Sequence, residues 1–175
     1  RGRMNAKGMS ARREIEEIYP LTPMQEGMLF HALLAPGGEE YFEQLNVRLE
    51  GDVRPELFRR AFAELTAAHA ILRTGFNWEK RKEPFQIVYR GVDAPWAEHD
   101  WRAVPAAGQA ARLEEFLRED RRRSFDLATA PLLRVHVIRM SETAWHFCWS
   151  HHHLLLDGWS RSLLVQEWLQ RYRAA

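Results

Sequence analysis

The sequence predicts an α+β domain, in which strands and helices are mixed, or a two-layer α/β sandwich. Apolar and polar residues alternate in 133–138 and again in 143–152, which is typical of strands with one buried face. Apolar residues recur at helical spacing in 57–65. The elements follow no regular strand–helix–strand order, and that irregularity favours the α+β class.

The first half of the chain opens with an extended segment that Pro20 and Pro23 restrict. Thr22 can cap the helix that follows, and Pro23 suits its first position. We expect this helix to end near Leu34, before a Pro-Gly-Gly turn. The next predicted elements are a strand over 41–49, a helix that ends near His69, and strands over 72–78 and 85–89.

The second half contains a loop, a helix, a hairpin and a final helix. Residues 91–107 hold two prolines and predict a loop with one brief strand. A helix is expected over 109–122, and the basic run that ends it reads as a solvated helix end. The strands over 133–138 and 143–152 are separated by a few polar residues, which predicts an antiparallel hairpin. The last helix is expected to begin near Trp159 or Ser160.

The composition excludes several functional classes. The chain has 175 residues, 46% of them hydrophobic and 28% charged, which is typical of a globular domain with a core. A net charge of +1 does not favour nucleic-acid binding. The single cysteine, Cys148, excludes a disulfide framework within the chain and fits a reducing, cytoplasmic compartment. No apolar run approaches the ~20 residues that span a membrane. Residues 1–14 read as a linker or an expression remnant.

The stretch SHHHLLLDGWS, residues 150–160, carries the strongest functional signal. If the preceding strand continues, its period of two places His151 and His153 on the same face as the tryptophans of that strand, with His152 on the other. Burial beside an apolar wall lowers the pKa of an imidazole, and a neutral imidazole at pH 7 suits a general base. The histidines could instead be purely structural, as buried core side chains whose ring nitrogens are hydrogen-bonded.

A metal site is disfavoured here, because only His151 and His153 could share an ion and no third ligand stands at an obvious spacing. Two roles remain open for Asp157: it could cap the last helix, or it could pair with a buried arginine. Gly158 permits a tight or left-handed turn into that helix.

Several stretches resemble the motifs of condensation domains of nonribosomal peptide synthetases, in the family's order. Residues 152–158, HHLLLDG, look like the core motif. Residues 19–31, YPLTPMQEGMLFH, resemble the opening motif, and 68–74, AHAILRT, resemble the second, with Ala68 where arginine is usual. Residues 124–134 resemble a further stretch. The resemblance covers residues 15 to about 172.

The resemblance implies a chloramphenicol-acetyltransferase-like fold and a single lobe, residues 15–175, of a two-lobe domain whose C-terminal lobe is absent. It implies that His153 is catalytic, that His152 and Gly158 support it, and that Asp157 is structural, with Arg73 as the expected partner in a salt bridge. No directly bound cofactor is implied.

The implied reaction joins two acyl groups delivered on the phosphopantetheine arms of donor and acceptor carrier proteins. An adenylation domain would adjoin the parent domain. The opening motif also resembles the subtype that takes a D-configured donor and an L-configured acceptor.

Two alternatives stay open at this point: a stand-alone coenzyme A-dependent acyltransferase of the same fold, and a non-catalytic lobe that binds carrier proteins.

Overall fold

The computed structural model describes residues 14–35, 37–79 and 82–175. Residues 1–13, most of the predicted linker, lie outside this description. The elements are β1 (Ile15–Pro20), α1 (Pro23–Leu34), β2 (Phe42–Glu50), α2 (Pro55–Ala68), the 3-10 helix η1 (Ala70–Arg73), β3 (Thr74–Asn77), β4 (Phe85–Tyr89), β5 (Trp96–Asp100), α3 (Ala106–Arg122), β6 (Leu133–Arg139), β7 (Ala144–His152) and α4 (Gly158–Ala174). This mixture of strands and helices confirms the α+β class.

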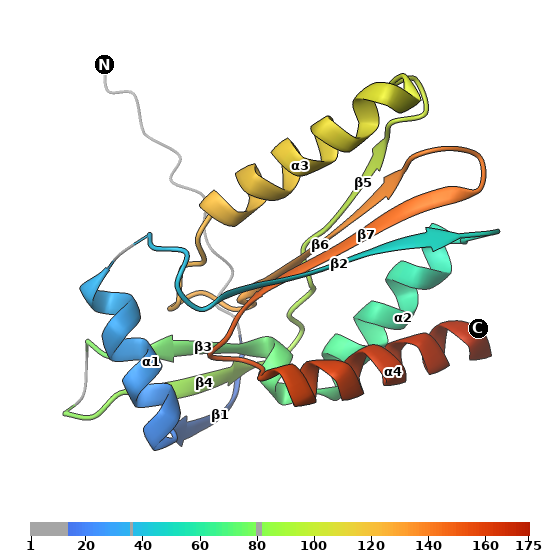
Figure 1. The fold of residues 1–175 in the computed structure, drawn as a ribbon. Helices are drawn as coiled ribbons and strands as arrows, with labels where there is room; N and C mark the ends of the chain where they lie inside the picture. Colours follow the sequence, from blue (N-terminus) through green and yellow to red (C-terminus); the bar gives the residue numbers. More distant parts are fainter. Residues whose placement is uncertain (1–13, 36, 80–81) are drawn as a thin grey trace, which may run out of the picture.

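The strands form two separate sheets (Figure 1). The smaller sheet has the order β1-β4-β3 and is antiparallel. The larger sheet has the order β2-β7-β6-β5, in which only the β5–β6 pair is parallel. The predicted hairpin is confirmed as β6 and β7. The brief strand expected within 91–107 is β5, and the strand expected from residue 72 begins at Thr74, after η1.

Helices cover both faces of the larger sheet, with α3 on one side and α2 and α4 on the other (Figure 1). The core under α2 and α4 is aromatic. Phe62 meets Trp149 of β7 edge-on, with ring centroids 5.3 Å apart, and Trp168 of α4 contacts Phe147 at 4.4 Å. Such pairs stabilise a core beyond their buried area alone. The aromatic face predicted for β7 therefore forms the main part of the hydrophobic core.

The face under α3 includes buried polar and charged side chains. Asp120, near the end of α3, is buried and bonds Arg134 of β6, Ser150 of β7 and Gln44 of β2. The basic run after it is exposed, as predicted, but Asp120 itself is not. Its three partners all lie on one face of the sheet, so a single carboxylate fastens the helix to three strands.

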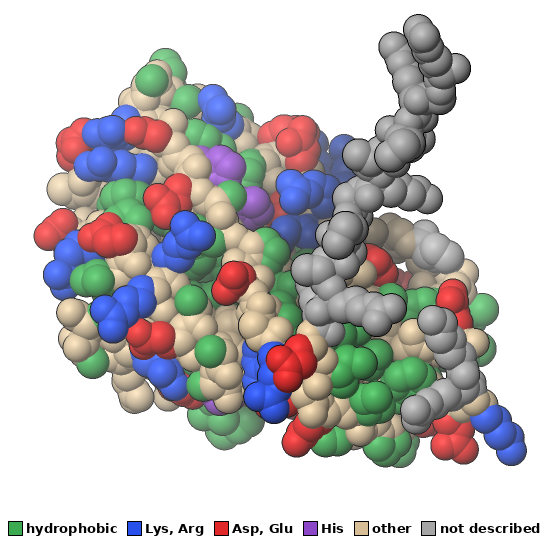
Figure 2. Space-filling model, turned by 180° about the vertical axis from the view of Figure 1, so that it is seen from behind, with side chains coloured by type: hydrophobic (Ala, Val, Ile, Leu, Met, Phe, Trp, Pro, Cys, Tyr) green, Lys and Arg blue, Asp and Glu red, His purple; other side chains and the backbone are tan. Residues whose placement is uncertain are grey.

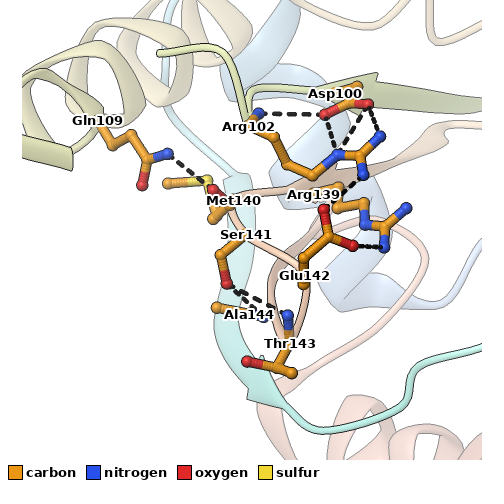
Figure 3. Close-up of polar contacts among 9 residues, drawn as sticks. All are labelled: Asp100, Arg102, Gln109, Arg139, Met140, Ser141, Glu142, Thr143 and Ala144. Atoms are coloured by element: carbon orange, nitrogen blue, oxygen red, sulfur yellow. Dashed lines mark hydrogen bonds and ion pairs between the residues drawn. The ribbon is translucent and has the colours of Figure 1, made fainter. Parts of the chain in front are cut away.

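The far end of the β6–β7 hairpin is held by a second set of polar contacts (Figure 3). Arg102 donates to both Asp100 and Glu142, and Glu142 also accepts from Arg139. The Gln109 side chain of α3 donates to the Met140 carbonyl at 2.8 Å. These contacts tie the β5–α3 connection to the hairpin turn and so fix the strand that leads to the histidines.

The surface carries mixed charge. On the face shown in Figure 2, basic and acidic side chains are interspersed, and hydrophobic side chains gather on the side of the smaller sheet. Within the described residues, no helix combines the length and the apolar character needed to cross a bilayer.

Candidate active site

His153 lies immediately beyond the end of β7, in the turn that leads to α4. The strand stops at His152, and the turn begins because the Leu155 N–H donates to the His152 carbonyl at 3.0 Å. His151 lies on the aromatic face beside Trp149, as predicted, with ring centroids 5.5 Å apart. The strand expected to carry His153 on the same face ends one residue before it, so His153 lies in the turn.

The backbone and the ring of His153 both contact Tyr41, the residue before β2. The His153 N–H donates to the Tyr41 carbonyl at 2.7 Å. The two rings are parallel within 3°, with centroids 6.5 Å apart. The imidazole is half-buried, and its Nδ1 is enclosed without a hydrogen-bond partner among the described residues. Sequence reasoning missed Tyr41, because nothing in its neighbourhood marks it.

The three leucines after His153 form a rigid backing for it. Leu154, Leu155 and Leu156 are all buried. The Gln25 side chain of α1 donates to the Leu154 carbonyl at 3.2 Å. Gln25 also closes a capping box with Thr22, whose cap role was predicted. Sequence reasoning missed Gln25, although the Thr-x-x-Gln spacing is a signal that marks it.

Asp157 caps α4, and the expected pairing with Arg73 is wrong. Its Oδ1 accepts the Ser160 N–H at 2.7 Å. This backbone hydrogen bond is the main cause that holds the pKa of Asp157 below its usual value. Asp157 is exposed, whereas Arg73 is buried and has other partners. The role of Asp157 is therefore the first of the two that the sequence left open.

Arg73 is turned toward the smaller sheet. Its Nη1 lies 2.6 Å from Glu16 Oε2 on β1 and 2.6 Å from the Tyr89 carbonyl on β4, and its Nε donates to the Thr66 carbonyl. These partners satisfy the guanidinium where η1 leads into β3. The arginine of the second motif thus joins β1 and β4 to the end of α2.

Gly158 begins α4 without the left-handed backbone that the sequence allowed. The only glycines with positive φ among the described residues are Gly37, Gly51 and Gly91. A Cβ built at Gly158 would meet no atom within 4 Å. Its side faces open space in this chain, so the geometry of the lobe alone does not require glycine there.

The other two histidines of the 151–153 run are neutral at pH 7, because burial lowers the pKa of each. His151 is fully buried, and both its ring nitrogens lack partners within the described part of the chain; burial lowers its pKa to about 3. Burial likewise lowers the pKa of His152 to about 4, and its Nδ1 accepts the Leu154 N–H at 3.2 Å. The lowered pKa predicted for an imidazole beside this apolar wall is confirmed for His151, whereas His152 lies on the other face of the strand. His152 thus supports the loop through a hydrogen bond.

A cleft of about 210 Å³ opens beside His152. Aromatic side chains of Phe42, Trp78 and Phe125 line it together with His152. No group of three or more His, Cys, Asp or Glu side chains in the described ranges could hold a metal ion. The arrangement offers a part-exposed imidazole, that of His153, in a turn backed by buried leucines, and the neighbouring His152 lines a cleft of mixed polar and apolar character.

Comparison with known proteins places this arrangement in a family. The family model described as "Condensation domain" matches residues 15–175. One of the linear gramicidin synthase proteins of Brevibacillus parabrevis is 45% identical over 162 residues, which is 93% of this chain and 2% of that protein. Bacitracin synthase 1 of Bacillus licheniformis is 38% identical over 159 residues, 91% of this chain and 3% of that protein. The chain therefore spans a small fraction of these relatives.

The fold has solved counterparts as well. The starter condensation domain of rhizomide synthetase RzmA superposes with a TM-score of 0.81 at 23% identity, over 91% of this chain and 39% of that one. At this identity the likeness concerns the fold. It confirms the predicted fold, and the chain spans about two fifths of that structure.

Proposed function

The chain belongs to the condensation-domain family of nonribosomal peptide synthetases, and we propose that it is the N-terminal lobe that bears the catalytic histidine, His153. The observation that supports this role is the placement of the ring. It is half-buried at the tip of a loop that three buried leucines and the Asp157 cap hold rigid. A group held this way can meet a substrate in one orientation.

The proposed reaction forms an amide bond between two carrier-bound acyl groups. The α-amine nitrogen of the acceptor attacks the thioester carbonyl carbon of the donor. A C–N bond forms, the C–S bond breaks, and the proton that leaves the amine is balanced by the proton that the departing thiolate takes up. The products are an extended peptide on the acceptor carrier and a free thiol on the donor carrier.

His153 acts on the attacking amine in one of two ways. It accepts the proton that the amine loses, or it orients the amine and stabilises the charge that develops. An α-ammonium group has a pKa of about 8, so its deprotonation near pH 7 costs little free energy. Positioning of the amine by His153 can therefore matter more than the basicity of the imidazole. His152 contributes by bonding the Leu154 N–H, and Asp157 by capping α4.

The partners follow from the proposal. Donor and acceptor carrier proteins deliver the thioesters on phosphopantetheine arms, a C-terminal lobe completes the site, and an adenylation domain adjoins it in the parent. The isolated lobe should therefore show no turnover. The free, buried Cys148, whose pKa burial raises to about 12, suits a reducing cytoplasm.

The stereochemical preference is a finer part of the proposal. The opening motif, residues 19–31, resembles the subtype that takes a D-configured donor and an L-configured acceptor. Comparing D- and L-donors on the same carrier tests this directly. A faster rate with the L-donor would reject the subtype and leave the reaction class intact.

The reaction is tested in the full parent condensation domain with loaded carriers. His153→Ala should lower dipeptide formation by about 100-fold or more, the range of a lost general base. His99→Ala, a histidine on β5 away from the loop, is the matched control and should keep its rate. Circular dichroism checks that both variants fold. A His153→Ala variant as active as the parent would remove His153 from the mechanism.

One observation favours a second candidate, a coenzyme A-dependent acyltransferase. A mutant of the RzmA starter condensation domain was crystallised in complex with C8-CoA. Offering acyl-coenzyme A with a free amine, without carrier proteins, tests this function. Turnover comparable to that with loaded carriers would favour it, and its absence would favour the carrier-dependent reaction.

A further inference from the structure

We propose that Tyr41 is a positioning residue for the reaction, and that it holds the His153 imidazole in its reactive orientation. The inference rests on the proposed function, because it assigns Tyr41 a role only through His153. Tyr41 stands just before β2, outside the stretches that resemble family motifs. What singles it out is the combination of its backbone conformation with two contacts to one residue.

The two contacts fix different parts of His153. The Tyr41 carbonyl accepts the His153 N–H at 2.7 Å, which anchors the backbone from which the ring projects. The Tyr41 ring lies parallel to the imidazole, with 3° between the planes and 6.5 Å between centroids. Aromatic pairs favour such offset stacking at separations of about 4.5–7 Å. Together they restrict both the position and the tilt of the imidazole.

The pairing continues the register of the larger sheet. Phe42 of β2 lies opposite His152 of β7, so the residues just outside the ladder, Tyr41 and His153, face one another across its end. The β2–β7 pairing therefore places Tyr41 beside His153, and the Tyr41 ring lies along one side of the half-buried imidazole. The buried leucines follow on the other side of the turn.

The backbone of Tyr41 is the unusual feature. Its φ is +64°, and it is the only described residue other than glycine with a positive φ. Bulky side chains rarely adopt this conformation, and such outliers cluster at functional sites where the surroundings over-determine them. The positive φ sets the direction of the ring relative to the peptide that precedes Tyr41. In this conformation the residue presents both its carbonyl and its ring to His153.

The Tyr41 hydroxyl makes a separate contact. It lies 3.4 Å from Nδ1 of His31 at the exposed side of α1. This contact orients the phenol from the side away from the stack, and it distinguishes two ways in which Tyr41 could matter. If the ring carries the effect, phenylalanine should replace tyrosine; if the hydroxyl carries it, phenylalanine should fail.

The test uses the full parent condensation domain with loaded donor and acceptor carriers. Tyr41→Gly removes the ring at a position whose φ suits glycine, so the variant should fold. Its kcat for dipeptide formation should fall by about 10- to 100-fold, as expected when a catalytic group is misplaced, with KM for the acceptor carrier nearly unchanged. Tyr41→Phe keeps the ring and should restore most of the rate.

A double-mutant cycle separates positioning from a structural role. In a His153→Ala background, Tyr41→Gly should lower the residual rate no further, because the group it positions is gone. An equal loss in both backgrounds would overturn the proposal, as would a Tyr41→Gly variant with wild-type kcat or a Tyr41→Phe variant as impaired as Tyr41→Gly. An inactive wild type, or a fully active His153→Ala, would instead reject the proposed function.

Discussion

The Asp157 carboxylate accepts the Ser160 N–H at 2.7 Å, so the aspartate of the core motif ends the leucine loop by capping α4. Asp157→Ala removes the cap and should lower the Tm of the 175-residue chain by about 2–4 °C. Asp157→Asn keeps an oxygen acceptor and should retain most of that stability. Thermal unfolding followed by circular dichroism measures both variants.

The contrast for this prediction is Arg73→Met, which leaves Glu16 without its 2.6 Å partner and two backbone carbonyls without their donor. Its Tm should fall by several times as much as that of Asp157→Ala. If Asp157→Asn were as damaging as Asp157→Ala, the role of the carboxylate would be its charge, and the capping assignment would be wrong.

Asp120 is expected to make the free energy of unfolding fall at acidic pH. Burial alone would raise its pKa, but the side chains of His136, Ser150 and Arg134 outweigh burial and hold the pKa well below the usual value. A carboxylate with a lowered pKa stabilises the fold at pH values above its unfolded pKa, near ~4, and the stabilisation is lost as pH falls below that. Asp120→Asn should cost about 3–5 kcal/mol at pH 7, because it leaves the buried Arg134 without its counter-charge.

Urea unfolding at pH 7, 5 and 3 checks this prediction. The difference in unfolding free energy between the wild type and Asp120→Asn should narrow toward pH 3. Glu119→Gln, at the exposed neighbouring position, should match the wild type at every pH. A gap of constant size across the series would mean that the charge of Asp120 is not what stabilises the contact between α3 and the sheet.

His151 should add a second acid sensitivity in a different pH window. Its pKa is about 3 in the fold because of burial, against an ordinary value near ~6.5. Between these two pH values, His151 is protonated in the unfolded chain but not in the folded chain. The free energy of unfolding therefore falls by up to about 1.4 kcal/mol per pH unit as pH falls from 6.5 toward 3. His151→Phe, which cannot titrate, should show a shallower slope between pH 6.5 and 4.

Unfolding free energies at half-unit pH steps measure that slope. His69→Phe is the comparison, since the His69 ring is only part-buried and pairs with Glu167 at 2.8 Å. It should not reproduce the flattening. An unchanged slope in His151→Phe would show that His151 is protonated in the folded protein and thus not enclosed as described.

These residues also show how far the sequence could predict the site. The period of two in β7 was enough to separate His151 from His152, because a strand with one apolar face leaves little freedom of register. The Thr22 cap likewise depends on local chemistry, and it was predicted. Features of this kind are predictable because the interactions that cause them lie within a few residues of one another in the sequence.

Long-range partners were not predictable in the same way. Arg73 pairs with Glu16, 57 positions away, whereas the family resemblance implied Asp157 as its partner. Asp120 looked like part of a solvated run, because whether a helix end faces a sheet depends on tertiary packing. Tyr41 gave no signal, since tyrosine is disfavoured at positive φ and only the closing of the β2–β7 ladder onto His153 imposes it.

Gln25 joins α1 to the loop of His153, and its two functions can be separated. Its Oε1 accepts the Thr22 N–H at 3.0 Å, while its Nε2 donates to the Leu154 carbonyl at 3.2 Å. Gln25→Glu keeps the acceptor that the capping box needs but removes the donor, so α1 should persist while the loop loosens. The loss should be about 1 kcal/mol of unfolding free energy, with faster amide exchange at Leu154 and Leu155. Glu26→Gln, one position along the exposed side of α1, should leave exchange in the loop unchanged. Equal exchange in Gln25→Glu and wild type would mean that the buried leucines hold the loop without α1, and that α1 does not brace the turn of His153.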